Sequence, residues 1–223
     1  MKKHVVIVAG GAGTRMKTDL PKQFLMLGKL PVLMHTIEQF YKYDSTLNII
    51  VVLPQYQIEF WESLCNQHKY ATKHSVVSGG KTRYHSVQNG LGLVPEGSLV
   101  AIHDGVRPLI SKEVIAESYD LAEKKGSAIS AVPLKDSIRK TEGNKTVSKN
   151  RSEYYLVQTP QTFNASLLKQ AYNQTEPSEK FTDDASVFEA AHGQVNLITG
   201  DYKNIKITTP EDLIIAQALQ QNS

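Results

Sequence analysis

The 223-residue sequence predicts an α/β fold built on a doubly wound, mostly parallel β-sheet with a protruding β-hairpin arm. Short β-rich runs alternate with segments of helical periodicity, as in folds whose parallel strands are joined by helices. Several of these runs are apolar at consecutive positions, which is typical of strands covered on both faces. One stretch, 133–158, breaks the alternation. Because the length suits one large domain and 40% of the residues are hydrophobic, we expect a single domain over 1–223.

Strands and helices are predicted in turn along the chain. The predicted strands are 4–9, 48–53, 74–77, 98–103, 127–132 and 194–199. Between them, apolar residues recur every three or four positions and predict helices with one buried face. These faces are Leu33, Ile37, Phe40 and Tyr41; Ile58, Trp61, Leu64 and Cys65; and Val114, Leu121 and Ala122. A last helix begins at Pro210, with Thr209 as its N-cap and Asp212 in its first turn. Ligands of such folds bind beyond the carboxyl ends of the strands.

The stretch 133–158 has no helical periodicity. Its centre, Glu142-Gly143-Asn144-Lys145, has the residue types of a turn and lies between two polar, β-prone runs. We therefore expect a long hairpin that extends from the main body. A disordered loop is the alternative interpretation of the same residues.

Composition and charge exclude several classes of protein. The net charge of +3 comes from interspersed acidic and basic residues, so nucleic acid is not an expected partner. The longest apolar runs, 5–9 and 49–53, are far shorter than the ~20 residues of a membrane helix. Cys65 is the only cysteine, which excludes an internal disulfide and a cysteine-based metal site. We expect a cytoplasmic protein that does not bind membranes.

The first predicted strand leads directly into a glycine-rich turn, Ala9-Gly10-Gly11-Ala12-Gly13-Thr14-Arg15-Met16. Glycines after a strand allow backbone N–H groups to approach phosphate oxygens closely. A dinucleotide-binding fingerprint would need glycine where Met16 stands, and this motif is therefore excluded. A Walker A motif ending at Gly80-Lys81-Thr82 would need glycine where Ser75 stands, so it is excluded too. We expect the turn to bind a nucleotide through Ala9, Gly10, Gly11 and Gly13.

Two cations lie on this same loop: Arg15 closes the glycine-rich turn, and Lys22 follows seven residues later, directly after Pro21. Pro21 restricts the positions that the Lys22 ammonium can reach. Two cations on a phosphate-binding loop suit a triphosphate whose charge grows at a leaving pyrophosphate. We expect both on an exposed loop; the alternative is a surface arginine and lysine near an ordinary turn.

Three later clusters have similar chemistry. Residues 79–87 (GGKTRYHSV) form a glycine turn that enters a helix, where backbone donors are free. In 103–108 (HDGVRP), the carboxylate of Asp104 follows a strand end; it can serve sugar hydroxyls or a metal, or it is a turn residue. In 204–208 (NIKIT), Lys206 stands on a predicted short strand that aims it either into the site or at solvent.

Six blocks, in order along most of the chain, carry a resemblance to a known family. The blocks are AGGAGTRM with PKQF, GGKTR-x-x-SV-x-NGL, HDGVRP, QTPQ-x-F, TDDAS and NIKITTPEDL. Together they resemble the 2-C-methyl-D-erythritol 4-phosphate cytidylyltransferase family, usually called IspD. The resemblance implies a Rossmann-like nucleotidyltransferase fold and the transfer of CMP from CTP to methylerythritol phosphate, with Mg²⁺ and release of pyrophosphate, in isoprenoid precursor synthesis. It also implies a homodimer in which the arm, 133–158, completes the neighbour's site.

The resemblance implies a role for each matching residue. The catalytic cations fall on Arg15 and Lys22, which serve the transition state, and on Arg151 and Lys206, which position the attacking phosphate. Contacts to the nucleotide correspond to Gly80, Lys81 and Ser86, and contacts to the alditol phosphate to Asp104, Arg107, Ser137 and Thr182. Two positions depart from the family pattern: HDGVRP replaces the common HDAARP, and Lys81 stands where an acidic residue is frequent. These departures affect side-chain contacts and leave backbone contacts intact.

The implied reaction agrees with this set of residues. A phosphate monoester is largely a dianion at pH 7, because its second pKa is about 6, so the nucleophile requires no general base. Catalysis then consists of positioning and charge neutralisation, which the four cations and Mg²⁺ supply for in-line attack at the α-phosphorus. The sequence does not indicate which residues hold the metal.

Three alternatives stay open at this point. A ribitol 5-phosphate cytidylyltransferase resembles this chain across the CTP blocks, although TDDAS and NIKITTPEDL favour the methylerythritol enzyme. A nucleotide-sugar glycosyltransferase typically holds its metal with an Asp-x-Asp motif, which the sequence lacks. A non-catalytic nucleotide-binding module would not need Lys206 and Arg151 opposite the glycine-rich turn.

Overall fold

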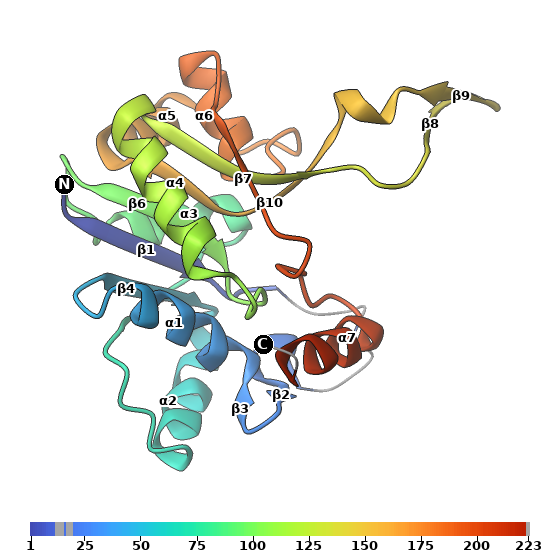
Figure 1. Cartoon of the computed structure of the whole chain (residues 1–223). Coiled ribbons are helices and arrows are strands. Elements are labelled where there is room, and N and C mark those ends of the chain that lie inside the picture. The colour runs from blue at the N-terminus through green and yellow to red at the C-terminus, as the bar shows by residue number, and fades with distance from the viewer. Residues whose placement is uncertain (12–15, 17–19, 222–223) are drawn as a thin grey trace.

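A seven-stranded sheet forms the centre of the molecule (Figure 1). The computed structural model describes residues 1–11, 16 and 20–221. The strand order across the sheet is β11 (Leu197–Thr199), β7 (Ser127–Pro133), β10 (Tyr155–Asn164), β6 (Leu99–Asp104), β1 (Lys3–Val8), β4 (Asn48–Leu53) and β5 (Ser75–Ser78). All neighbouring strands are parallel except β10, which runs antiparallel to both β6 and β7. The predicted doubly wound, mostly parallel sheet is confirmed.

Helices cover both faces of this sheet. One core cluster joins the sheet to α1 (Val32–Tyr43), α2 (Ile58–Gln67) and α4 (Lys112–Lys125), and the other joins it to α3 (Arg83–Leu91), α5 (Ala165–Gln174) and α6 (Asp184–His192). Along β1, Val5 and Ile7 belong to the first cluster and Val6 to the second. The consecutive apolar residues of this strand are therefore all buried, because successive side chains point to opposite covered faces.

Three parallel strands bring their carboxyl ends to one edge of the sheet. In the register of the ladder, Val8 of β1 is paired with Val52 of β4 on one side and with Asp104 of β6 on the other. The residues that follow β1 thus start beside the Asp104 carboxylate. The expected ligand site at the carboxyl ends of the strands has its structural basis here.

Each of the six strands predicted between 4 and 199 overlaps an observed one, but β10 was not predicted. Its sequence between Val157 and Gln161 contains Pro160 and is polar, which does not resemble a buried strand. The ladder between β10 and β7 changes register between Val157 and Gln161, so the proline and its neighbours are accommodated at an irregularity of the pairing. The predicted strand 194–199 is shorter in the structure and covers only Leu197–Thr199.

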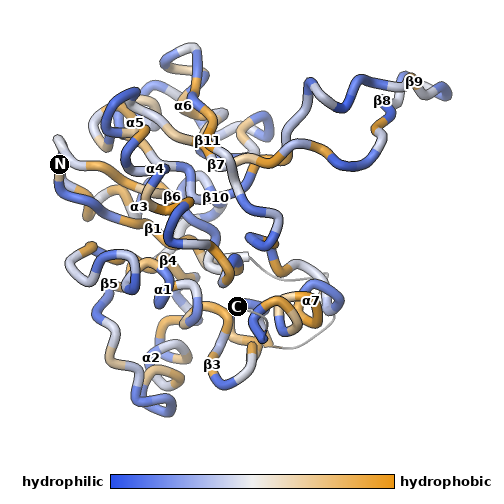
Figure 2. The backbone as a smooth tube through the Cα atoms, viewed as in Figure 1, coloured by the Kyte–Doolittle hydropathy of each residue, from blue (hydrophilic) through white to orange (hydrophobic). Residues whose placement is uncertain are grey.

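A two-stranded hairpin of β8 (Ile138–Glu142) and β9 (Lys145–Lys149) projects from the body (Figure 1). Figure 2 shows that this arm is mostly hydrophilic, while hydrophobic residues follow the strands of the main sheet. The ends of the predicted arm, 133–158, belong to the sheet, because Tyr155 pairs with Pro133. The hairpin is thus an extension of β7 and β10. Its role in dimerisation stays a prediction.

The C-terminal helix α7 (Pro210–Gln221) begins where the sequence predicts. The Asp212 carboxylate accepts hydrogen bonds from the backbone N–H groups of Thr208 and Thr209, both at 2.8 Å, and so stabilises the first turn. A small apolar cluster that includes Ala216 and Leu27 packs this helix near β2 (Met26–Leu27) and β3 (Leu30–Pro31). No helix in the described part of the chain is both long enough and apolar enough to cross a membrane.

The predicted short strand at 204–208 is not present. This segment forms no ladder and is held instead by side chains and by a backbone bond to another part of the chain, from Ile207 N–H to the Val106 carbonyl at 2.9 Å. Arg107 donates to the Asn204 carbonyl at 2.7 Å, and Asn204 Nδ2 donates to the Thr159 carbonyl at 2.8 Å. The alternating apolar residues of this segment do not indicate strand pairing. They attach the segment to the core through Ile207, which is fully buried.

Candidate active site

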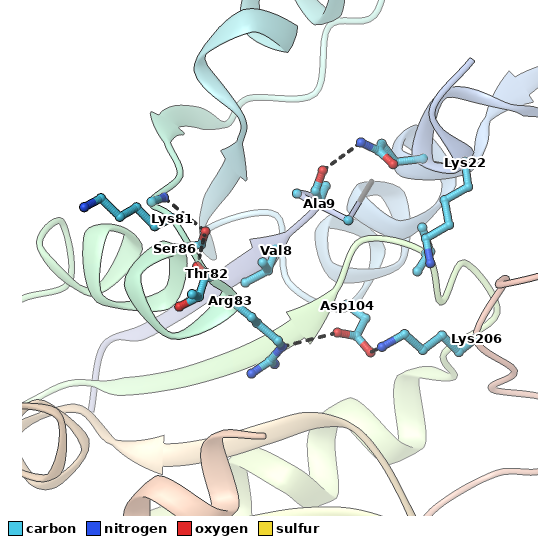
Figure 3. A pocket seen from close by; sticks show the side chains of 14 residues that line it. Val8, Ala9, Lys22, Lys81, Thr82, Arg83, Ser86, Asp104 and Lys206 are labelled. Carbon is cyan, nitrogen blue, oxygen red and sulfur yellow. Dashed lines mark hydrogen bonds and ion pairs between the residues drawn. The ribbon is translucent and has the colours of Figure 1, made fainter. Parts of the chain in front are cut away.

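A cleft of about 280 Å³ lies at the carboxyl ends of β1 and β6 (Figure 3). Its lining residues are Val8, Ala9, Gly10, Gly11, Lys22, Gln23, Gly80, Lys81, Thr82, Arg83, Ser86, Asp104, Val106 and Lys206. Four blocks of sequence that were singled out above thus meet at one place. The two remaining nucleotide-loop predictions, Gly13 and Arg15, lie outside the described residues.

The glycine-rich backbone forms one wall of this cleft. The Ala9 N–H donates to the Val52 carbonyl at 2.9 Å, so the chain is still tied to β4 where the glycines begin. A Cβ placed on Gly11 would lie 3.6 Å from Cε of Lys22. The side chain of Lys22 therefore lies directly against the glycine-rich backbone, as a cation that shares a phosphate with backbone donors must.

Lys22 begins a short 3-10 turn, Lys22–Phe24, that is anchored in the core by Phe24. The Phe24 N–H donates to the Pro21 carbonyl at 2.8 Å, which closes the turn. Lys22 itself is only 9% exposed, so the expectation that it stands on an exposed loop is wrong. Burial between the turn and the glycine-rich segment limits the motion of its ammonium, which suits a preorganised charge.

The opposite wall of the cleft is the turn that enters α3. The Gly80 N–H donates to Ser86 Oγ at 3.1 Å, and this hydroxyl donates to the Thr82 carbonyl at 2.9 Å. A Cβ on Gly80 would lie 2.4 Å from the Cβ of His85, so only glycine fits at this position. Ser86 therefore holds the shape of the turn. The Lys81 side chain is exposed and extends away from Asp104 and Lys206 (Figure 3).

Asp104 ends β6 and lines the cleft, and three cations lie near its carboxylate; Figure 3 shows two of them, Arg83 and Lys206. Lys206 Nζ lies 2.9 Å away, Arg107 Nε 3.4 Å and Arg83 Nε 3.9 Å. Burial alone would raise the pKa of Asp104. The positive charges of Arg83, Lys206 and Arg107 lower this pKa by more than burial raises it, so the pKa lies well below its usual range. The carboxylate is therefore ionised, and the cluster keeps an excess of positive charge.

The next residue, Gly105, explains one departure from the family pattern. A Cβ at this position would lie 2.8 Å from the Cβ of Ala9 and 3.1 Å from Cδ1 of Leu33. The Gly105 N–H also donates to the Val8 carbonyl at 2.9 Å. HDGVRP in place of HDAARP thus brings the backbone after Asp104 close to the backbone before the glycine-rich turn.

Arg83 is a site residue that the sequence analysis missed. Its Nη2 lies 2.6 Å from Oδ2 of Asp184, a fully buried carboxylate that also accepts a hydrogen bond of 2.7 Å from the Tyr172 hydroxyl. Arg83 thus connects Asp104 to the start of α6. Its position in the GGKTR block was a usable signal, but its partner Asp184 is far away in the sequence, in the TDDAS block.

A second pocket of about 240 Å³ adjoins the cleft and shares Arg83, Asp104 and Lys206 with it. Its other lining residues are Arg107, Val157, Gln158, Thr159, Gln161, Thr182 and Asp183. Thr182 thus lines the same pocket as Asp104, Arg107 and Lys206, and its contact with the alditol phosphate stays a prediction. Of the described residues that line this pocket, Val157 alone has an apolar side chain.

Arg151 and Ser137 lie at the base of the arm and are both exposed. Arg151 donates a hydrogen bond to the Lys135 carbonyl, and neither residue is among the described residues that line the cleft or the second pocket. Within one chain, these two predicted site residues are therefore not brought together with Lys22 and Lys206.

The described residues contain no group of three or more His, Cys, Asp and Glu side chains that could hold a metal ion. Asp104 is the one carboxylate among the described residues that line the cleft. A metal at this place would thus depend mainly on oxygens that a ligand provides.

Comparisons with known proteins show the family to which this chain is similar. The family model described as 2-C-methyl-D-erythritol 4-phosphate cytidylyltransferase (IspD) matches residues 3–222. A protein of that name from Bacteroides thetaiotaomicron is 54% identical over 98% of this chain and 100% of its own length, and one from Phocaeicola vulgatus is 50% identical over the same shares. A solved 4-diphosphocytidyl-2C-methyl-D-erythritol synthase from Anaerococcus prevotii, 31% identical, has a TM-score of 0.84 and covers 99% of this chain and 96% of its own.

Proposed function

The chain belongs to the 2-C-methyl-D-erythritol 4-phosphate cytidylyltransferase family, and from this premise we propose that it transfers CMP from CTP to 2-C-methyl-D-erythritol 4-phosphate, a step of isoprenoid precursor synthesis. One observation of the structure carries the proposal. The cleft and the second pocket adjoin and share Arg83, Asp104 and Lys206, so two anionic substrates can meet at a cationic junction. The chain is accordingly a nucleotidyltransferase.

The reaction is an in-line displacement at phosphorus. A phosphate oxygen of the alditol phosphate attacks the α-phosphorus of CTP, and the bond to the oxygen bridging to the β-phosphorus breaks, so pyrophosphate leaves with that electron pair. The attacking phosphate is already largely a dianion at pH 7, and no proton has to be removed from it. What the protein must supply is positive charge in fixed positions, because the two substrates repel each other.

The cleft is the proposed nucleotide site. Backbone N–H groups of Gly10, Gly11 and Gly13 would bind the phosphates, and Lys22 and Arg15 would neutralise the charge that develops on the leaving pyrophosphate. Ala9 lines the cleft but gives its own N–H to the Val52 carbonyl, so it would contribute by holding the start of the turn. The turn at Gly80, shaped by Ser86, is placed to receive the base and ribose. Because the Lys81 side chain extends away from Asp104, its contribution is made through the backbone.

The second pocket is the proposed alditol site. Asp104 and Thr182 offer oxygen acceptors or donors to hydroxyl groups, and Arg107 holds Asp104 in place. Lys206 lies at the junction and is the cation for the attacking phosphate. The apolar side chain of Val157 suits the single methyl branch of methylerythritol, whereas ribitol has no methyl group. This contact favours the methylerythritol substrate over ribitol 5-phosphate.

The two exposed residues of the arm base complete the proposal. Arg151 and Ser137 are not among the described residues that line the cleft or the second pocket of their own chain, so we assign them to the site of a second copy in a homodimer formed through the arm, 133–158. A hairpin with two polar faces is marginal alone and gains stability when it packs against a partner.

We also place the protein in the cytoplasm.

Mg²⁺ is the proposed metal. It is usually held by one or two carboxylates together with substrate phosphates, and Asp104 is a carboxylate of this kind beside the proposed triphosphate position. When bound, the ion would supply further positive charge to the phosphates. The ligand set of this chain fits a metal that arrives with the nucleotide.

A panel assay tests the proposal. CTP, UTP, ATP and GTP are each combined with methylerythritol phosphate or ribitol 5-phosphate, with Mg²⁺, and pyrophosphate release is measured. We expect release with CTP and methylerythritol phosphate far above every other pair. Release only with ribitol 5-phosphate would assign the chain to the ribitol reaction, and no release with any pair would favour a non-catalytic nucleotide-binding module.

A further inference from the structure

Gln23 follows Lys22 directly and is completely buried beneath the cleft. Its side-chain Nε2 donates two hydrogen bonds, one to the Ala9 carbonyl and one to Oε1 of Gln57, both at 2.8 Å. Three segments of the chain therefore meet at one amide group. They are the end of β1, the turn that carries Lys22, and the 3-10 turn Gln55–Gln57 that follows β4.

The orientation of this amide is fixed by its partners. A backbone carbonyl can only accept a hydrogen bond, so the atom next to Ala9 O must be the nitrogen of Gln23. The other end of the amide, Oε1, is buried and has no hydrogen-bond partner among the described residues. A buried acceptor without a partner lowers stability, and an apolar side chain of similar shape would avoid this cost.

The bond to Ala9 acts on the part of the backbone that precedes Gly10 and Gly11. The Ala9 N–H is held by Val52 at 2.9 Å and its carbonyl by Gln23 at 2.8 Å, so both polar groups of this residue are fixed. On the other side of Gln23, the Lys22 side chain lies against Gly11, where an added Cβ would be 3.6 Å from Cε. Gln23 thus connects the segment before the glycines to the turn that carries Lys22 through one hydrogen bond to Ala9.

We propose that Gln23 is a positioning residue of the reaction, which fixes the distance between the phosphate-facing backbone after Ala9 and the ammonium of Lys22. Gln57 acts behind it as the acceptor that holds the second N–H of the amide. The inference rests on the proposed function, because it assigns Gln23 to the same transition state as Lys22. Its effect is expected on kcat, since the spacing of the two groups matters most when charge moves to the pyrophosphate.

Matched glutamine-to-glutamate substitutions test this assignment. In Gln23→Glu, the donor becomes a carboxylate oxygen that faces two acceptors, so the distance between the glycine-rich backbone and Lys22 is no longer fixed. We expect kcat to fall about 10–100-fold, with little change in KM for methylerythritol phosphate. In Gln57→Glu, the same change keeps the acceptor, and we expect a loss of about threefold or less. Gln55→Glu, at an exposed position two residues away, is the control for added negative charge.

The pH dependence separates positioning from a general loss of structure. Burial raises the pKa of a carboxyl group, and once protonated the introduced carboxyl recovers one donor. The ratio of kcat for Gln23→Glu to that of the wild type should therefore rise several-fold between pH 8.5 and pH 6.5. A loss of the same size at both pH values would mean that the substitution acts on the fold, and would overturn the proposal.

Two further outcomes decide the case. If the wild type releases no pyrophosphate from CTP and methylerythritol phosphate, the proposed function fails before Gln23 is tested. If the wild type is active and Gln57→Glu is as damaging as Gln23→Glu, or Gln23→Glu is within twofold of the wild type, the positioning role is wrong. Thermal unfolding shows whether Gln23→Glu folds. If it does not fold, Gln57→Leu is measured in its place, because leucine removes the acceptor that Gln57→Glu keeps. We then expect a lower kcat for Gln57→Leu than for Gln57→Glu, and equal kcat values for these two variants would contradict the proposal.

Discussion

The ammonium of Lys206 lies 2.9 Å from the carboxylate of Asp104, at the junction of the cleft and the second pocket. The Lys206 side chain is 41% exposed and that of Asp104 only 10%, so the lysine is the more accessible end of this ion pair. Asp104 is also held by Arg83 and Arg107. Lys206 can therefore turn toward a substrate phosphate without leaving a buried charge unpaired.

Lys22→Ala should lower kcat by about 10²–10³, which is typical for the loss of one preorganised charge contact to a transition state. The same result is expected of Arg15→Ala. Because Lys22 is buried, its truncation should also lower the thermal midpoint, so unfolding has to be measured beside steady-state kinetics. Lys29→Ala, at an exposed turn nearby, is the control. A near-normal kcat of Lys22→Ala would remove this lysine from the transition state.

Lys81→Ala should leave the preference for CTP over ATP nearly intact. The Gly80 turn keeps its shape through Ser86. The Lys81 side chain extends away from Asp104. The measurement is the ratio of kcat/KM for the two nucleotides in the variant and in the wild type. A large collapse of this ratio would show that the lysine side chain recognises the base.

Val157→Thr should weaken the discrimination between methylerythritol phosphate and erythritol 4-phosphate, which lacks the methyl branch. One methyl group in an apolar pocket changes specificity about 10–200-fold. The smaller figure is the upper limit here, because Val157 is the one apolar side chain among the described lining residues and is 46% exposed. The two values of kcat/KM are compared, with Val147→Thr on the arm as the matched control. An unchanged ratio would exclude Val157 from the methyl contact.

Mixing Lys22→Ala with Arg151→Ala should restore activity if each site takes its Arg151 from the second chain. Both variants are expected to be inactive alone. In a mixed dimer, one site carries both defects and the other site carries neither. Random exchange makes about half of the dimers mixed, and each of these has one intact site of two, so roughly a quarter of wild-type activity should return. Exchange of subunits is followed by mass spectrometry of differently tagged chains. No recovery despite proven exchange would mean that Arg151 acts in its own chain.

His103→Gln should flatten the pH dependence of stability between pH 7 and pH 5. Burial lowers the pKa of His103 to about 3, so the folded protein keeps this ring neutral. The unfolded chain, with a pKa of about 6.5, binds a proton as the pH falls, so stability is lost from about pH 6.5 downward by up to ~1.4 kcal/mol per unit. Urea unfolding of the wild type should therefore show about 2 kcal/mol more loss over this range than the variant.

The sequence predicted the parts of the fold that depend on local pattern. Consecutive apolar residues, as in 48–53, identified strands covered on both faces, and the cap residues Thr209 and Pro210 located the last helix. β10 could not be found in this way. Its buried residues, such as Gln158 and Gln161, are polar and are stabilised by hydrogen bonds to segments far along the chain.

The site was predictable where its residues stand in compact blocks. Lys22, Gly80 and Asp104 each follow a strand or turn that the sequence marks, and parallel strands bring such ends together. Arg83 was missed because its significance depends on Asp184, which only tertiary structure brings within 2.6 Å. The direction of Lys206 was equally undetermined, since no strand pairing fixes that segment.

β10 lies between β6 and β7 in the sheet but follows both in the sequence. During synthesis, the cleft can therefore form before the second pocket. β1, β4, β5 and β6 already form a continuous parallel sheet by residue 104, and every described residue of the cleft except Lys206 belongs to the first 106 residues. Most of the cleft is thus made early in synthesis. The pocket beside it has to wait until the ribosome has delivered residues 155–164 and 182–206.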